Sequence, residues 1–392
     1  MNPGDAVDLD VGPVAHGGHC VARLSTPDGT GLVVFVRHAL PGERVRAVVT
    51  EQRRGYLRAD AVEVLSASPD RVPPPCPYAG PGRCGGCDFQ HATVAAQLAL
   101  KAVVIREQLT RLAGVSVPVE VEPLPGGPLG WRSRVQYTVD GRGRLGFFQH
   151  RSHVVVPVDR CLIAHPAIGV PPGSAVGPDV GSVEAVASSG GDVTVLTRPR
   201  RGAGSARVVS GPALVRERAV CREWTVEAGA FWQVHPSAPD VLAEAVLDLL
   251  DPRPGEHALD LYGGAGLFAA ALAGRGATVT LVESDPRGVQ AARRNLADLP
   301  VRVVRADASR FRARRADLVV LDPPRAGVGA AVVRTVAGWR PRAVAYVSCD
   351  PAAFARDVAT FREAGWRLDR LRAFDAFPMT HHVEVVGLLT PG

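Results

Sequence analysis

The fold is decided by "HALDLYGGAGLF", residues 257–268, in which a short apolar run leads into a turn with Gly263, Gly264 and Gly266. Glycines where a first strand meets a first helix let the backbone approach a ligand closely. From about residue 229, strand-like and helix-like runs alternate; the strand-like runs are "ATVTLVES" (277–284), "VRVVRAD" (301–307), "ADLVVLDPP" (316–324) and "AVAYVSCDP" (343–351). This alternation predicts an α/β domain over residues 229–392, with a Rossmann-like, doubly wound parallel sheet that binds ligands at the carboxyl ends of its strands.

Acidic residues end the second and third of these runs. Glu283 follows the glycine turn at about the 20-residue spacing expected for a carboxylate that binds a ribose hydroxyl. A glycine turn and one acid fit either a nicotinamide cofactor or S-adenosylmethionine. Ala269 stands where the dinucleotide fingerprint has its third glycine, and Asp307 is placed to meet an adenine. These two features favour S-adenosylmethionine.

The next two strands end in groups suited to a planar base. "LVVLDPPR", residues 318–325, puts Asp322 before two prolines, which fix an extended edge. "YVSCDP", residues 346–351, puts Cys349 at the same edge of the sheet, although a lone cysteine is often a packed structural thiol. The helix start expected after Asp350 predicts a stabilised thiolate at Cys349.

A thiolate beside a methyl donor suggests attack on a pyrimidine ring. Addition of the thiolate to carbon 6 makes carbon 5 nucleophilic, and a base must later remove the carbon 5 proton. In "FPMTHHVEVVGLL", residues 377–389, Glu384 lies in an apolar strand, where burial raises the pKa of a carboxyl. His381 and His382 are alternative bases.

The N-terminal part of the chain is organised differently. Short β-branched runs over residues 1–67 predict a small OB-like barrel, which either binds nucleic acid or serves only for packing. Residues 68–228 predict a β-rich central domain that begins with the Pro/Gly-rich segment "SPDRVPPPCPYAGPGRCGGCDFQ" (68–90) and a helix over residues 92–113. We therefore expect three domains.

Four of the seven cysteines form a set. Cys76, Cys84 and Cys87 have the spacing Cys-x7-Cys-x2-Cys, and Cys161 follows a later β-like run. Four thiolates suit zinc or an iron-sulfur cluster. Three clustered cysteines and a distant fourth favour a 4Fe-4S cluster.

The charge and hydropathy of the chain indicate which kinds of molecule the protein could bind and where it is located. The net charge of +6 fits a polyanion such as nucleic acid, and all but one of the 45 basic residues are arginine. The arginine groups at 132/134, 142/144 and 198/200/201 could contact phosphates or could simply be solvated. Neither a membrane-spanning run nor a signal peptide is evident, so we expect a cytoplasmic protein, which we interpret as a monomer.

The chain resembles the RNA uracil-5-methyltransferase family, whose members with a TRAM domain and an iron-sulfur cluster modify 23S ribosomal RNA or transfer RNA. The resemblance rests on "GLVVFVRHALPGERVRAVV", "CPYAGPGRCGGCDFQH" with Cys161, "FWQVHP", "DLYGGAGLF", "LDPPR", "SCDP" and "FPMTHHVE", in the family's order. It implies a class I S-adenosylmethionine-dependent methyltransferase domain, an N-terminal TRAM barrel, and a helix 92–113 that packs on the catalytic domain.

The resemblance also implies roles for single residues. Cys349 is expected to be the nucleophile and Glu384 the base. Gln233, Tyr262, Glu283 and Asp322 are expected to line the S-adenosylmethionine and uracil sites, with Asp307 near the adenine.

The function that we expect is therefore methyl transfer to carbon 5 of a uridine in RNA, through a covalent cysteine adduct at carbon 6, with 23S ribosomal RNA favoured. The alternatives are a transfer RNA uridine-5-methyltransferase, a cytosine-5-methyltransferase, and a non-catalytic RNA-binding iron-sulfur protein.

Overall fold

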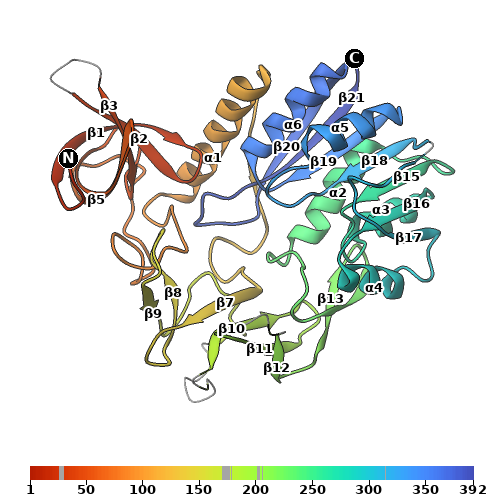
Figure 1. Cartoon of the computed structure of the whole chain (residues 1–392), viewed down its shortest axis with the longest axis horizontal. Helices are drawn as coiled ribbons and strands as arrows, with labels where there is room; N and C mark the ends of the chain where they lie inside the picture. The colour runs from red at the N-terminus through yellow and green to blue at the C-terminus, as the bar shows by residue number, and fades with distance from the viewer. Residues whose placement is uncertain (26–30, 170–176, 178, 201–203, 205, 314) are drawn as a thin grey trace.

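The structure is a computed structural model that describes residues 1–25, 31–169, 177, 179–200, 204, 206–313 and 315–392 of the chain. Figure 1 shows a β-barrel at the N-terminal end, a large sheet flanked by helices at the C-terminal end, and a second sheet below and between them. Of the arginines expected to meet phosphates, Arg201 lies outside the described residues.

The N-terminal barrel is closed, in the strand order β1-β2-β3-β5-β4. Alternate residues point inward, so that Val34, Val36, Val45 and Ala47 are fully buried in its core. This confirms the small barrel expected from the sequence. Its strands are β1 (Ala6–Ala15), β2 (His19–Leu24), β3 (Leu32–Arg37), β4 (Arg44–Arg53) and β5 (Tyr56–Ser66).

The central region contains an antiparallel sheet and a separate hairpin. The six-stranded sheet has the order β12-β11-β10-β7-β8-β9, and β13 pairs with β14. The strands are β7 (Arg134–Val139), β8 (Leu145–Phe148), β9 (Val155–Pro157), β10 (Val180–Ala187), β11 (Val193–Pro199), β12 (Arg207–Ser210), β13 (Leu214–Ala219) and β14 (Arg222–Glu227).

The C-terminal sheet has eight strands in the order β17-β16-β15-β18-β19-β21-β20-β6. Strands β15 to β19 are parallel, as expected, whereas β21 runs antiparallel between β19 and β20. The edge strand β6 comes from the segment that we assigned to the central domain. The strands are β6 (Val121–Pro123), β15 (His257–Leu261), β16 (Thr278–Glu283), β17 (Val301–Arg305), β18 (Leu318–Leu321), β19 (Ala343–Ser348), β20 (Trp366–Asp375) and β21 (Glu384–Pro391).

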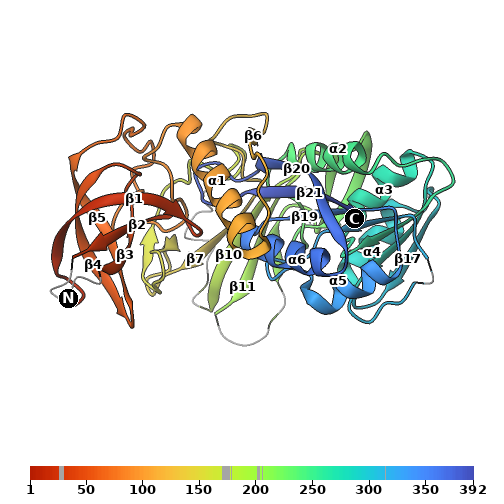
Figure 2. The ribbon, with the colours of Figure 1, turned by 90° about the horizontal axis from the view of Figure 1, so that it is seen from above.

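Helices cover both faces of this sheet, which confirms the doubly wound architecture (Figure 2). One face packs against α2 (Ala238–Leu250), α3 (Leu267–Gly274) and α4 (Pro286–Asn295), and the other against α5 (Gly329–Gly338) and α6 (Pro351–Glu363). Within the described residues, no helix is both long enough and apolar enough to cross a membrane.

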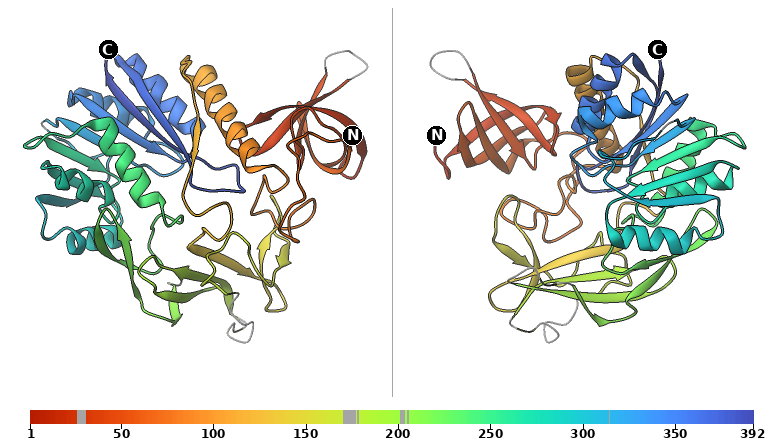
Figure 3. Two further views of the ribbon diagram at one scale, coloured as in Figure 1. Left: turned by 180° about the vertical axis from the view of Figure 1, so that it is seen from behind. Right: turned by 45° about the vertical axis from the view of Figure 1, so that its right-hand side comes forward.

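Helix α1 (Val94–Gln108), which ends in a π-helical turn η1 (Leu109–Ala113), joins the barrel to the C-terminal domain. Leu100 and Val104 pack in the barrel core, while Ile105 and Leu109 pack in the core of the large sheet. Figure 3 shows α1 standing between the two bodies. The helix thus buries two faces, against different domains.

The chain's single lysine lies inside this junction. Lys101 of α1 is 2% exposed, and its Nζ lies 2.5 Å from Asp375 Oδ1 and donates to the Phe377 carbonyl oxygen at 3.1 Å. Desolvation of a buried ammonium is offset only when its partners are held in place. The pair therefore ties α1 to the end of β20.

We predict that Lys101→Ala destabilises the protein by about 3–5 kcal/mol, because Asp375 would keep a buried charge without its partner. The double substitution Lys101→Met with Asp375→Leu should recover most of that loss, since both charges are then removed. Denaturant unfolding of the three proteins gives the comparison. Equal losses in the single and double variants would contradict a coupled pair.

Candidate active site

A cavity of about 1020 Å³ opens at the carboxyl ends of the parallel strands and extends to residues 76–90, here called the cysteine loop because they include Cys76, Cys84 and Cys87. Its walls include nearly all the residues that the sequence singled out: Gln233, Tyr262, Gly264, Glu283, Asp307, Asp322, Cys349, Glu384, Cys76, Cys84, Cys87 and Cys161. Gly266 is not among its lining residues. It caps α3 instead, with a φ of 102°, and an added Cβ would lie 2.4 Å from Leu296.

The glycine turn is shaped by backbone strain and close packing. Tyr262 has a φ of 65°, unusual for a bulky side chain, and such strain is often found at ligand sites. A Cβ on Gly263 would lie 2.5 Å from Leu281 Cγ, so only glycine fits there. The Gly264 amide donates to Glu283 Oε2 at 2.9 Å. Glu283 thus holds the turn while it lines the cavity.

The carboxylates of Glu283 and Asp307 both accept hydrogen bonds from residues that follow them in the chain. Glu283 Oε1 also accepts hydrogen bonds from the Ser284 and Asp285 amides, at 2.6 and 2.7 Å. Asp307 is exposed, and its Oδ1 accepts from the Ser309 amide and hydroxyl, which lowers the pKa of Asp307. Both carboxylates are thus held by backbone donors beside the cavity.

Asp260 is a candidate site residue that we did not single out from the sequence. It is completely buried beneath the glycine turn, where Oδ2 accepts from the Ala269 amide at 3.0 Å and Oδ1 has no hydrogen-bond partner. Burial and the nearby Asp322 charge raise the pKa of Asp260 to about 8. The sequence feature that could have indicated Asp260 is an acidic residue inside the apolar run "HALDLY", because acids are seldom fully buried without a reason.

Cys349 sits among acids. The pKa of the Cys349 thiol is raised to about 12, mainly by burial and further by the charges of Glu384 and Asp322. Our expectation of a thiolate stabilised by the start of α6 was therefore wrong for the protein alone, because desolvation and negative neighbours outweigh the helix terminus. Burial also raises the pKa of Asp322 to about 7 and that of Glu384 well above its usual range.

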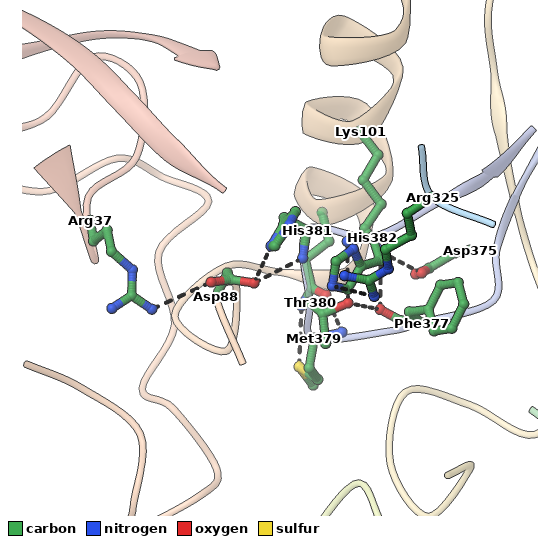
Figure 4. A network of polar contacts seen from close by, with 11 residues as sticks. Arg37, Asp88, Lys101, Arg325, Asp375, Phe377, Met379, Thr380, His381 and His382 are labelled. Carbon is green, nitrogen blue, oxygen red and sulfur yellow. Dashed lines mark hydrogen bonds and ion pairs between the residues drawn. The ribbon is translucent and has the colours of Figure 1, made fainter. Parts of the chain in front are cut away.

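The two histidines that were alternatives to Glu384 both have polar partners, although His382 also lines the cavity. His381 Nδ1 lies 2.6 Å from Asp88 Oδ2, and His382 Nε2 lies 3.3 Å from Arg325 Nη2 (Figure 4). Burial lowers the pKa of His382 to about 3, and the neighbouring His381 and Arg325 lower it further. Glu384 remains the acid that faces Cys349 from the adjacent strand.

The segment between β20 and β21, residues 376–383, is here called the base loop because it leads into Glu384. Met379, with a φ of 68°, donates its amide to Gln97 Oε1 at 3.0 Å. Its carbonyl accepts from the Asp88 and Phe89 amides, both at 3.0 Å. The loop is thus clamped by α1 and by the cysteine loop, which lie far away in the sequence.

The four cysteines also line the cavity and are all free thiols. They are close enough to interact electrostatically: burial raises the pKa of Cys84 to about 11, and Cys161 and Cys76 add to the shift. Among the described residues, no three His, Cys, Asp or Glu side chains are grouped to hold a single metal ion. The donor set suits a group with four thiolate ligands, such as an iron-sulfur cube.

The arginines that could contact phosphates have different surroundings. Arg134 is buried, and its Nη2 pairs with Glu217 Oε1 at 2.9 Å, so that it cannot meet a phosphate. Arg144 pairs with Asp140 at the surface. Arg132 does line the cavity, with its guanidinium 5.8 Å from the Trp131 ring centre.

Comparisons with known proteins find relatives over nearly the whole chain. Family models match for the TRAM domain (residues 2–62), the methyltransferase small domain (229–337) and tRNA (Uracil-5-)-methyltransferase (303–391). An RNA methyltransferase of Streptomyces avermitilis is 49% identical, with 99% of each chain covered. The 23S rRNA (uracil(1939)-C(5))-methyltransferase RlmD of Chromohalobacter salexigens is 34% identical, over 97% of this chain and 89% of that protein.

A solved structure extends the likeness to three dimensions. The Pyrococcus abyssi tRNA (uracil-54, C5)-methyltransferase, crystallised with S-adenosyl-L-homocysteine, superposes with a TM-score of 0.72. It is 25% identical, and the match covers 95% of this chain and 99% of that one.

We predict that Asp260 makes the unliganded protein less stable as the pH rises from about 4 to about 8. An acid whose pKa is higher in the folded state favours folding when protonated, so its contribution is lost with rising pH, by at most ~1.4 kcal/mol per unit. Asp260→Asn should flatten the decline, as measured by denaturant unfolding at pH 5 and pH 8. Asp307→Asn, at an exposed acid, is the control and should leave the decline unchanged.

Proposed function

Because this chain belongs to the family of TRAM-domain RNA uracil-5-methyltransferases, we propose that it transfers a methyl group from S-adenosylmethionine to carbon 5 of a uridine in 23S ribosomal RNA. The observation that carries the proposal is the meeting of Cys349 and Glu384 in one cavity with the glycine turn. A thiol, a buried carboxyl and a cofactor turn are the three parts that this reaction needs.

We assign the cofactor to the end of the cavity formed by the glycine turn. S-adenosylmethionine supplies an electrophilic methyl group on a positively charged sulfur. Tyr262, Gly264 and Glu283 would line its place, with Asp307 at the rim. The unpartnered Oδ1 of Asp260 and the raised pKa of Asp322 fit a site that is completed by a cation.

Cys349 is the nucleophile in this proposal. Its sulfur forms a bond to carbon 6 of the uracil, and the electron pair of the 5,6 double bond moves toward the carbonyl at carbon 4, so that carbon 5 can take the methyl group. Burial and its acidic neighbours disfavour the thiolate, so the thiol must lose its proton to solvent before the sulfur attacks carbon 6. Arg325 is the cation near Cys349 that opposes those acids.

Glu384 is the base. After methyl transfer, its carboxylate takes the proton from carbon 5, and the sulfur leaves carbon 6 as the double bond reforms. Burial makes this carboxylate a stronger proton acceptor than an exposed glutamate would be. Its strand, β21, lies directly beside β19, which ends just before Cys349, so that the two groups face one pocket.

The entrance to the cavity suits an extruded base. Phe231 is 75% exposed, although it is apolar, and lines the same cavity as Gln233. An exposed aromatic ring can stack on a base, and a glutamine amide can both donate and accept hydrogen bonds at a base edge. A paired uridine cannot reach Cys349, so it must leave its helix first.

Ribosomal RNA is favoured over transfer RNA by the relatives. The named 23S enzyme is 34% identical over most of both chains, whereas the transfer RNA enzyme with the similar fold is 25% identical. A transfer RNA substrate is the alternative. Mapping of 5-methyluridine in both RNA classes, from cells with and without the gene, distinguishes them.

We also propose that Cys76, Cys84, Cys87 and Cys161 bind a 4Fe-4S cluster. The support is that four free thiols line one cavity and interact electrostatically with one another, together with the chemistry of that donor set. A cluster there would stabilise the loop that carries Asp88 and Phe89, which clamps the base loop.

We predict that Glu384→Gln accumulates a covalent protein-RNA adduct, because the carbon 5 proton would remain and the sulfur could not leave. Denaturing gel electrophoresis after incubation with S-adenosylmethionine and 23S RNA fragments measures it. The double variant with Cys349→Ala should form no adduct, and Cys349→Ala alone should abolish methyl transfer while still binding RNA. An adduct that persists without Cys349 would overturn the assignment.

We predict that anaerobically purified protein contains about four irons and four acid-labile sulfides per chain. Cys161→Ser should lower both contents, whereas Cys20→Ser, at a buried barrel cysteine away from the set, should leave them unchanged. Stoichiometric zinc without iron would contradict the cluster.

A further inference from the structure

The turn between β1 and β2, residues 16–18, leaves the barrel on the side that faces α1 and the catalytic domain (Figures 1 and 2). This part of the TRAM barrel reaches the candidate active site itself. Two of its residues contact the segments that carry the nucleophile and the base.

His16 contacts the residue that follows the nucleophile. Its Nε2 lies 3.3 Å from Asp350 Oδ2. The other carboxylate oxygen of Asp350 accepts from the Ala353 amide at 2.7 Å and so caps α6. The Asp350 amide and carbonyl also bond to the Ser348 hydroxyl, at 3.3 and 3.2 Å. Asp350 therefore fixes the backbone on both sides of Cys349, and His16 holds Asp350 from the barrel.

Gly18 contacts the base loop and the cysteine loop at once. It is buried, with a φ of 77°. A Cβ at this position would lie 2.8 Å from His381 Cβ and 3.0 Å from Asp88 Cβ. Both are atoms next to the backbone, so neither loop could yield by rotating a side chain. The turn thus packs against the hydrogen-bonded pair of His381 and Asp88. His381 lies in the base loop, three residues before Glu384.

A third contact joins the barrel to the same point. Arg37, at the end of β3, is 8% exposed, and its Nη2 lies 3.3 Å from Asp88 Oδ1. Figure 4 shows Asp88 lying between Arg37 of the barrel and His381 of the base loop. The barrel therefore supports the catalytic segments at three places.

We propose that the β1–β2 turn of the TRAM barrel is a positioning element of the catalytic centre, in which His16 holds Asp350 beside the nucleophile and Gly18 sets the position of the base loop. The inference rests on the proposed function and goes beyond RNA binding by the barrel. A barrel that only bound RNA would change affinity when altered. A turn that positions Cys349 and Glu384 changes the rate of the bound complex instead.

The test compares Gly18→Ala with Gly42→Ala. Gly42 has a similar φ, of 82°, in the same barrel, but its Cβ would meet nothing within 4 Å. Both variants carry the same kind of backbone strain, and only Gly18→Ala displaces the catalytic loops. At saturating RNA we expect Gly18→Ala to lower kcat about 100-fold, the cost of a displacement on the order of 1 Å, with the Kd for RNA unchanged. Gly42→Ala should keep the wild-type kcat.

His16 variants test the second contact without backbone strain. His16→Ala should lower kcat, and His16→Gln, which keeps a side-chain N–H for Asp350, should restore part of it, again without a change in the Kd for RNA. If Gly18→Ala and Gly42→Ala have equal kcat, or if these variants change only RNA affinity, the positioning role is overturned. A wild-type enzyme that methylates neither RNA class refutes the proposed function instead.

Discussion

The base loop, residues 376–383, is the constraint on which the rest of the site depends. This loop lies between strands β20 and β21 and is not itself part of a strand. Its C-terminal end nevertheless places Glu384 opposite Cys349. The ordering comes from outside: Lys101 binds its first turn, Gln97 its middle, and Asp88 its last part. These three residues lie almost 300 positions away along the chain. The position of Glu384 is therefore set by tertiary contacts.

The charge of the cavity is the second constraint. Asp260, Asp322 and Glu384 are acids in one low-dielectric region, and each has a pKa raised by burial. Holding such groups together costs folding free energy, which natural proteins tolerate mainly at functional sites. The same excess of acid that suppresses the Cys349 thiolate in the protein alone suits a cationic methyl donor. The site is thus incomplete until its substrates bind.

The sequence predicted what depends on local pattern. The glycine turn, the strand ends at Asp322 and Cys349, and the closed barrel follow from periodicity and turn chemistry, and the structure has them. The electrostatics at Cys349 did not follow, because a pKa depends on neighbours from other strands. Arg134 looked like a surface cation, and only the fold shows it buried against Glu217. Likewise, nothing local shows that β6 completes the catalytic sheet or that His16 meets Asp350.

Helix α1 explains why these parts act as one body. A helix that buries one face can dock on a single domain, but α1 buries Leu100 and Val104 in the barrel and Ile105 and Leu109 in the catalytic core. Separating the domains would expose apolar surface on both sides and would also leave Lys101 and Asp375 unpaired. The barrel therefore cannot drift as a tethered module. Its turn stays against Asp350 and the base loop, and in the proposed reaction the proposed nucleophile and base are held in place by the same junction that holds the barrel.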